Sequence, residues 1–72
     1  MMYCFYLTFD IYFMDGTKSV YEARARGKRS VMYVSDVEDL RLAVERKAVQ
    51  EHGKEVSAVM LINSHRTIDD TE

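Results

Sequence analysis

Cysteine is scarce in this chain of 72 residues, and its scarcity narrows the ways in which so short a fold can be stabilised. A domain of this size buries only about 60% of its unfolded surface, so disulfides, metals or self-association commonly support it. Cys4 is the single cysteine, which excludes a disulfide within the chain. His52 and His65 lie far from it and match no zinc-ligand spacing, so we expect no metal site. Self-association is the device that remains.

Catalytic and cofactor motifs are also missing. The sequence contains no nucleophile–base pair, no glycine-rich phosphate loop and no metal-binding box, so we expect a non-enzymatic protein without a cofactor. Asp10 is interpreted as a polar sheet position in preference to a catalytic carboxylate. Cys4 is interpreted as a small buried side chain in preference to a reactive thiol.

Export and membrane signals are absent as well. No basic segment precedes the apolar N-terminus and no small-residue cleavage site follows it. The apolar stretch is too short to span a bilayer, and Asp10 interrupts it. With a lone thiol, these features lead us to expect an intracellular protein that does not enter a membrane. Proline is absent, and no repeat or linker divides the chain.

What the sequence does contain is a long alternation of apolar and mixed residues near its N-terminus. Period-two alternation is typical of a half-buried strand, and a second alternating segment follows, with Tyr21, Ala23 and Ala25 at its apolar odd positions. The apolar set occupies the odd positions Tyr3, Phe5, Leu7, Phe9, Ile11 and Phe13. These segments predict a β-hairpin whose odd face is buried and whose even face carries tyrosines.

The turn of this hairpin follows from the pattern. A two-residue loop would oppose Leu7 with Arg24 and bring charge into the core. A three-residue loop over residues 14–16 instead opposes Leu7 with Ala23, and it needs Gly16 in the left-handed conformation. This second register is the one we predict. It also places two tyrosines opposite cations on the even face.

A single helix is predicted from about Ser35 to His52. Ser35 and Glu38 have the spacing of a capping box, and Gly53 is the expected left-handed stop. One apolar stripe of this helix should cover the odd face of the hairpin. Its members are Val37, Leu40, Val44 and Ala48.

The last strand is predicted over residues 56–63, followed by a polar, frayed tail over residues 64–72. Residues 59–62 are apolar without alternation, as in a strand that is covered on both sides or packed against a partner. The predicted fold class is α+β. It is a ββαβ domain over residues 1–63, with a three-stranded antiparallel sheet of order 2-1-3 and one helix packed on one face.

A basic run is the main candidate binding site, and we predict that Tyr6 and Tyr12 join it in one partner-binding surface. The run consists of Arg24, Arg26, Lys28 and Arg29. Three interpretations remain open: a charged edge strand that resists aggregation, a site for a protein, and a site for nucleic acid with Tyr6 stacking on bases. A net charge of −2 argues against general DNA binding.

Further apolar residues are predicted on surfaces that one helix cannot cover. Leu42 and Val49 lie off the helix stripe, while Tyr6, Tyr12 and Met14 belong to the even face of the hairpin. Such residues in a short chain indicate a protein interface. We expect a symmetric homodimer through the open sheet face, with Tyr6, Tyr12 and the last strand, in preference to the helix. A monomer that keeps this surface for a foreign protein and a misassigned core are the alternatives.

Three segments carry a resemblance to known proteins: Cys4-Phe5-Tyr6 through Phe9, Val34-Ser35-Asp36-Val37-Glu38-Asp39-Leu40, and Val59-Met60-Leu61-Ile62-Asn63. In these segments the chain resembles short ββαβ proteins encoded by bacteriophages and prophages. The resemblance implies an accessory protein in the cytoplasm of a bacterial host that binds a host protein, an inhibitor of a host defence system being one such role. The basic run is heavier than this group leads us to expect, which keeps nucleic-acid binding as the alternative.

Overall fold

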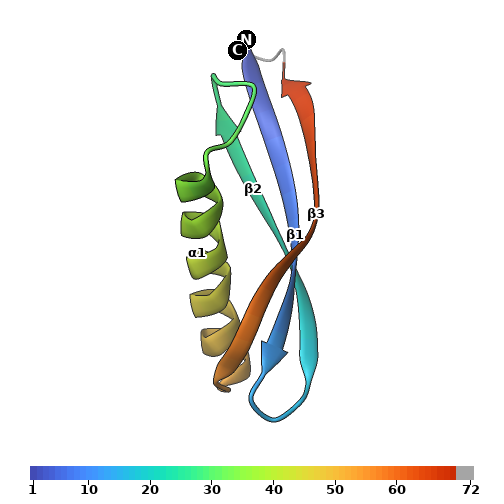
Figure 1. Ribbon diagram of the computed structural model, residues 1–72, viewed down its shortest axis with the longest axis vertical. Helices are drawn as coiled ribbons and strands as arrows, with labels where there is room; N and C mark the ends of the chain where they lie inside the picture. The colour runs from blue at the N-terminus through green and yellow to red at the C-terminus, as the bar shows by residue number, and fades with distance from the viewer. Residues whose placement is uncertain (70–72) are drawn as a thin grey trace.

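The computed structural model describes residues 1–69 and confirms the predicted fold class (Figure 1). Three antiparallel strands form one sheet in the order β2-β1-β3, and one helix lies between β2 and β3 in the chain. The elements are β1 (Met2–Phe13), β2 (Lys18–Gly27), α1 (Val34–His52) and β3 (Val56–Asp69). β1, the most apolar strand, lies in the middle as its composition predicts.

The hairpin has the predicted register. Leu7 pairs with Ala23 and Tyr6 with Arg24, so large side chains of β1 face small ones of β2 on the buried side. Gly16 takes the left-handed conformation with φ 88°, and its N–H donates to the carbonyl of Phe13 over 3.0 Å. The three-residue loop is therefore confirmed.

The core lies between the odd face of β1 and one side of α1. Leu7, Phe9 and Ile11 are almost fully buried, and the helix adds Val44 and Ala48. Val37 and Leu40 pack against this cluster while partly exposed, so the predicted stripe is confirmed. The left-handed cap is confirmed as well, because Gly53 has φ 64° and donates to the carbonyl of Val49 over 2.8 Å.

The predicted N-cap residue of the helix is wrong by two positions. Tyr33, not Ser35, is the N-cap residue, and Ser35 lies in the first turn. The carboxylate of Asp36 accepts the backbone N–H of Tyr33 at 3.1 Å, which satisfies a donor at the helix end. Glu38, the expected partner of Ser35, instead binds Arg41 at 2.9 Å. The bond from Tyr33 to Asp36 therefore fixes the start of the helix, which the spacing of Ser35 and Glu38 predicted two residues later.

β3 is longer than predicted, because it continues through Ser64–Asp69 where a frayed tail was expected. The reason is the length of β1, whose residues 2–7 would otherwise have no partner on that side. Residues 70–72 of the predicted tail lie outside the described residues. β3 also carries two bulges: Ser57 and Ile62 are extra residues with no partner of their own on β1.

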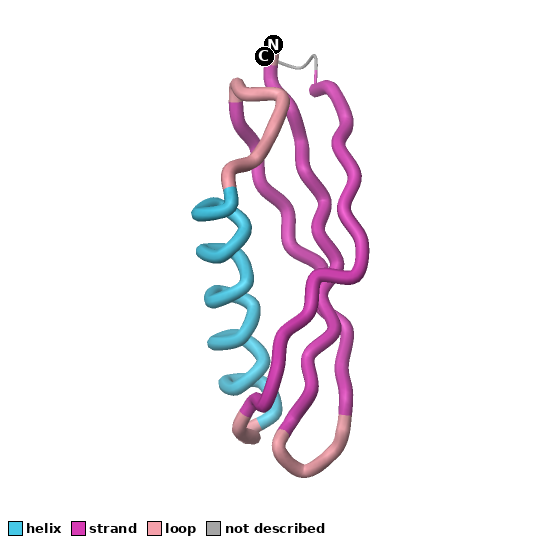
Figure 2. The backbone as a smooth tube through the Cα atoms, viewed as in Figure 1, coloured by secondary structure: helices cyan, strands magenta, loops and turns pink. Residues whose placement is uncertain are grey.

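The helix covers only one face of the sheet, and only part of its length (Figure 2). The molecule is 43 Å along its longest axis, whereas 19 helical residues span about 28 Å. The loop over residues 28–33 extends this cover, and its Met32 packs against the core. The other face of the sheet has no such cover among the described residues.

Candidate functional site

The uncovered side of the sheet presents the even-numbered positions of β1. Figure 1 shows α1 on one face of the sheet. Side chains alternate between the faces of a strand, and the odd positions fill the core beneath α1, so the even ones belong to the opposite face. Cross-strand partners on β2 and β3 share this side. We call this surface the open face. Its members on β1 are Cys4, Tyr6, Thr8, Asp10 and Tyr12, together with the residues paired to them.

One half of the open face is aromatic and basic. The ring of Tyr6 stacks on that of His65, with centroids 4.7 Å apart and planes inclined by 11°. Arg24 is the partner of Tyr6 on β2 and is exposed. The sequence prediction missed His65 because it assigned this residue to the tail. Three strands thus bring a tyrosine, a histidine and an arginine side by side, all suited to binding a protein surface.

The other half of the open face contains a buried carboxylate. Asp10 is only 7% exposed, and its neighbours across the sheet are the exposed residues Val20 and Met60. Its Oδ2 lies 3.3 Å from the ammonium of Lys18 and 3.5 Å from the hydroxyl of Tyr12. Its Oδ1 is buried with no hydrogen-bond partner among the described residues. The predicted polar sheet position is therefore an ion-paired group within an apolar surround.

Two members of the predicted basic run are joined to carboxylates. The guanidinium of Arg26 lies 2.7 Å from Asp69, whose carboxylate is also 3.8 Å from the sulfur of Cys4. Arg29 lies 3.4 Å from Asp36 and stacks over the ring of Tyr33, with 4.0 Å between its guanidinium carbon and the ring centroid. All four residues of the run are exposed. Half of their positive charge is therefore balanced within the chain.

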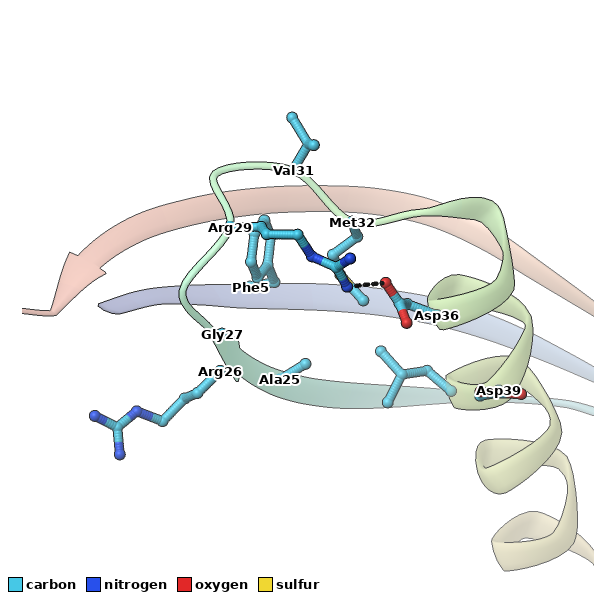
Figure 3. Close-up of a pocket in the computed structure, with 10 residues that line it drawn as sticks. Phe5, Ala25, Arg26, Gly27, Arg29, Val31, Met32, Asp36 and Asp39 are labelled. Carbon is cyan, nitrogen blue, oxygen red and sulfur yellow. Dashed lines mark hydrogen bonds and ion pairs between the residues drawn. The ribbon is translucent and has the colours of Figure 1, made fainter. Parts of the chain in front are cut away.

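The run is also divided in space. Arg24 and Arg26 belong to the open face because they pair with Tyr6 and Cys4. Arg29 belongs to the loop before α1 and points toward the helix, as Figure 3 shows. A cavity of about 270 Å³ lies beneath this loop. Phe5 and Met32 line it, so its base is apolar and its rim is charged.

The predicted self-association residues separate into two groups. Tyr6 and Tyr12 lie on the open face, as expected. Met14 lies in the hairpin turn, where it lines a surface cavity together with Val49 of α1. Leu42 lies two helical turns from Val49 on the same side of the helix, and both are exposed. These residues therefore do not form one continuous patch with the tyrosines.

The largest pKa shift among the described residues occurs at the far end of the hairpin, away from the arginines. The hydroxyl and N–H of Thr17, together with Lys54, hold the pKa of the Asp15 carboxyl well below its ordinary value of 3.8. Burial, aided by the hydrogen bond to Glu51, raises the pKa of Tyr21 above 10.0. The bonds from Thr17 to Asp15 hold the turn in place, and the bond from Tyr21 to Glu51 joins β2 to the end of the helix.

The described residues contain no group of three or more histidine, cysteine, aspartate or glutamate side chains arranged to bind a metal ion. Within the same part of the chain, no helix has both the length and the apolar character that crossing a membrane requires. Comparison with protein-family models, with curated proteins and with solved structures gives no match to this chain.

Proposed function

We propose that this chain is a non-enzymatic binding protein whose open face receives another protein. One observation carries the proposal. An entire face of the sheet has no covering element among the described residues, yet it holds Tyr6, Tyr12 and Met60 rather than only short polar side chains. Tyrosine, methionine and arginine are enriched in protein interfaces. A surface of this composition gains stability when a partner removes it from water.

The charges of the open face favour a selective partner. Lys18 and Arg24 are exposed along β2, and Glu22 lies between them. Val20 and Met60 form an apolar centre around the buried Asp10. Binding sites commonly combine an apolar centre with a polar rim, because the rim rejects mismatched charges. The resemblance to phage proteins supports a host protein as the partner, in the bacterial cytoplasm, with a defence component as one candidate.

A capture experiment with matched variants tests this proposal. The protein is immobilised and bacterial lysate is passed over wild type, Val20→Glu and Val34→Glu. Both valines are exposed, but Val20 lies on the open face and Val34 begins α1. We expect mass spectrometry to find a protein that binds wild type and Val34→Glu at least tenfold more than Val20→Glu. Equal capture by the two variants would contradict binding through the open face.

Nucleic-acid binding is the second candidate, and Arg24 together with Lys28 supports it. Both side chains are exposed, and Arg24 lies beside the stacked rings of Tyr6 and His65. The ion pairs of Arg26 and Arg29 oppose it, because those cations are already balanced. Binding to single-stranded and duplex DNA across a salt series decides between the two. Nucleic-acid function predicts a fall in log affinity with a slope of about 0.7–0.9 for each phosphate contacted.

A further inference from the structure

The two edges of the sheet are chemically different. The outer edge of β2 carries the charged residues Lys18, Glu22, Arg24 and Arg26, which discourage another strand from pairing with it. β3 is the other edge, and its residues 56–64 contain neither charge nor proline. Met60, Leu61 and Ile62 are exposed by 54%, 42% and 51%. Only the β3 edge therefore offers unprotected backbone groups beside apolar side chains.

The side of α1 toward β3 also carries exposed apolar residues. Val37 and Leu61 line one cavity, whereas Leu40 and Ala25 line another. The two flanks of the helix therefore face β3 and β2 respectively. Val49 shares a third cavity with Val56, which places it on the β3 side. Leu42 lies seven residues before Val49 and is also exposed, so two apolar side chains of the helix lie on the side toward β3.

We propose that β3 pairs antiparallel with β3 of a second copy to form a six-stranded sheet. When β3 of one copy pairs antiparallel with β3 of another, a two-fold axis relates the copies, so both contribute the same surface to the interface. Pairing centred on Met60 would set Leu61 of one copy opposite Val59 of the other. Both side chains point to the α1 side, because they pair with the core residues Phe9 and Ile11. In this register, the side chains that lie on the α1 side in one copy meet side chains on the α1 side of the other.

Charge and geometry fit this arrangement. The uncharged segment lies between Glu55 at one end and His65 with Arg66 at the other. Antiparallel pairing brings Glu55 of one copy near the basic end of the other, whereas parallel pairing would align like ends. The bulges at Ser57 and Ile62 limit regular pairing to residues 59–61, because Ala58 would oppose the bulged Ile62, so we expect association that depends on concentration. The two open faces would then adjoin on the side away from the helices.

Sedimentation equilibrium over a wide concentration range tests the pairing. Wild type should rise from the 8.4 kDa of one chain toward twice that mass. Leu61→Lys and Ile62→Lys should remain at one chain mass, whereas Val34→Lys, altered at the exposed first residue of α1, should behave as wild type. Circular dichroism confirms that each variant is folded. Ile62 is exposed at a bulge, so its variant should fold even where Leu61→Lys does not.

Amide hydrogen exchange locates the contact. In wild type, the amides within residues 59–61 that point away from β1 should exchange at least fivefold more slowly at high than at low concentration, and in Ile62→Lys they should not. A single mass of 8.4 kDa at every concentration would overturn the proposal, and so would a dimer that survives in both lysine variants. Neither outcome bears on the proposed function, because Val20→Glu changes capture through the open face and leaves the β3 edge intact.

Discussion

At the scale of single residues, the same side-chain type behaves according to its surroundings. Asp10 and Asp15 are both ion-paired to lysine, at 3.3 Å and 3.0 Å. Asp10 is buried and keeps one oxygen without a partner, whereas Asp15 is exposed and accepts two bonds from Thr17. Burial of an incompletely bonded carboxylate costs free energy, while an exposed and fully bonded one stabilises the turn. Two predictions follow from this contrast.

Replacing Asp10 by valine should leave the free energy of unfolding unchanged or raise it. The change removes a buried carboxylate with an unpaired oxygen and adds a side chain that suits a strand between Val20 and Met60. Lys18→Ala should instead lower the free energy of unfolding by about 1 kcal/mol, since it leaves Asp10 without its cation. Urea unfolding measures both. A larger loss in Asp10→Val than in Lys18→Ala would refute this account.

The turn should respond to acid through Asp15. Because its folded-state pKa lies below the ordinary value of 3.8, the carboxylate stabilises the fold above that value, and this contribution is lost as pH falls further. Wild type should therefore be more stable than Asp15→Asn near neutral pH, and the difference should shrink below about pH 4. Thermal unfolding of both proteins as a function of pH checks this. A difference independent of pH would show that the charge of Asp15 does not matter.

At the scale of elements, the start of α1 shows how neighbours choose between two competing signals. Ser35 with Glu38 has the right spacing for a cap, but Asp36 bonds the N–H of Tyr33 and also meets Arg29. The ring of Tyr33 lies under the same arginine. One carboxylate thus joins the loop before the helix to its first turn. The negative charge also suits the positive end of the helix dipole.

The two candidate caps can be separated by substitution. Asp36→Ala should lower the free energy of unfolding by about 1 kcal/mol, the usual cost of losing a helix cap. Ser35→Ala should change it by no more than about 0.5 kcal/mol, because its side chain lies on the exposed first turn. Chemical denaturation of the two variants gives the comparison. If Ser35→Ala proved the costlier change, the helix would start where the sequence pattern placed it.

At the scale of the whole molecule, β1 holds the fold together because it pairs along most of its length on both sides. Its first half depends on residues 64–69 of β3, where the Tyr6–His65 stack lies. A side chain of the same segment, Arg66, donates to the carbonyl of Ser30 and closes the loop over Phe5. The last part of the described chain is therefore a structural part of the sheet.

A chain that ends after Asn63 should lose stability. It lacks six cross-strand pairs with residues 2–7 of β1, and at about 0.2–1 kcal/mol each their loss costs about 1–6 kcal/mol. His65→Ala, which removes only the stack on Tyr6, should cost no more than about 1.5 kcal/mol. Equilibrium unfolding of both proteins provides the test. Unchanged stability after truncation is the result expected of a frayed tail, and it would contradict the longer strand.

Most of the hairpin and helix was determined by the sequence itself, because the signals there are local. Alternation over β1 and β2 determines which side chains point to the core and which to the open face. Only a three-residue turn with Gly16 in the left-handed conformation gives a register that keeps Arg24 out of the core. The stop at Gly53 needs only a residue that accepts positive φ. Among the site residues, Tyr6, Tyr12 and Arg24 could be assigned to the uncovered face for the same reason, since position along a strand decides the side.

Tertiary structure alone decided the remaining features, because each depends on residues far apart in the chain. The length of β3 follows from the unpaired half of β1, which polar residues 64–69 do not reveal. His65 enters the open face only through that pairing, and Asp10 is buried only because β2 and β3 supply its neighbours. The apolar run of residues 59–62 predicted a strand that is covered on both sides or packed against a partner. Its exposure at a sheet edge appears only once the strand order and the position of α1 are known.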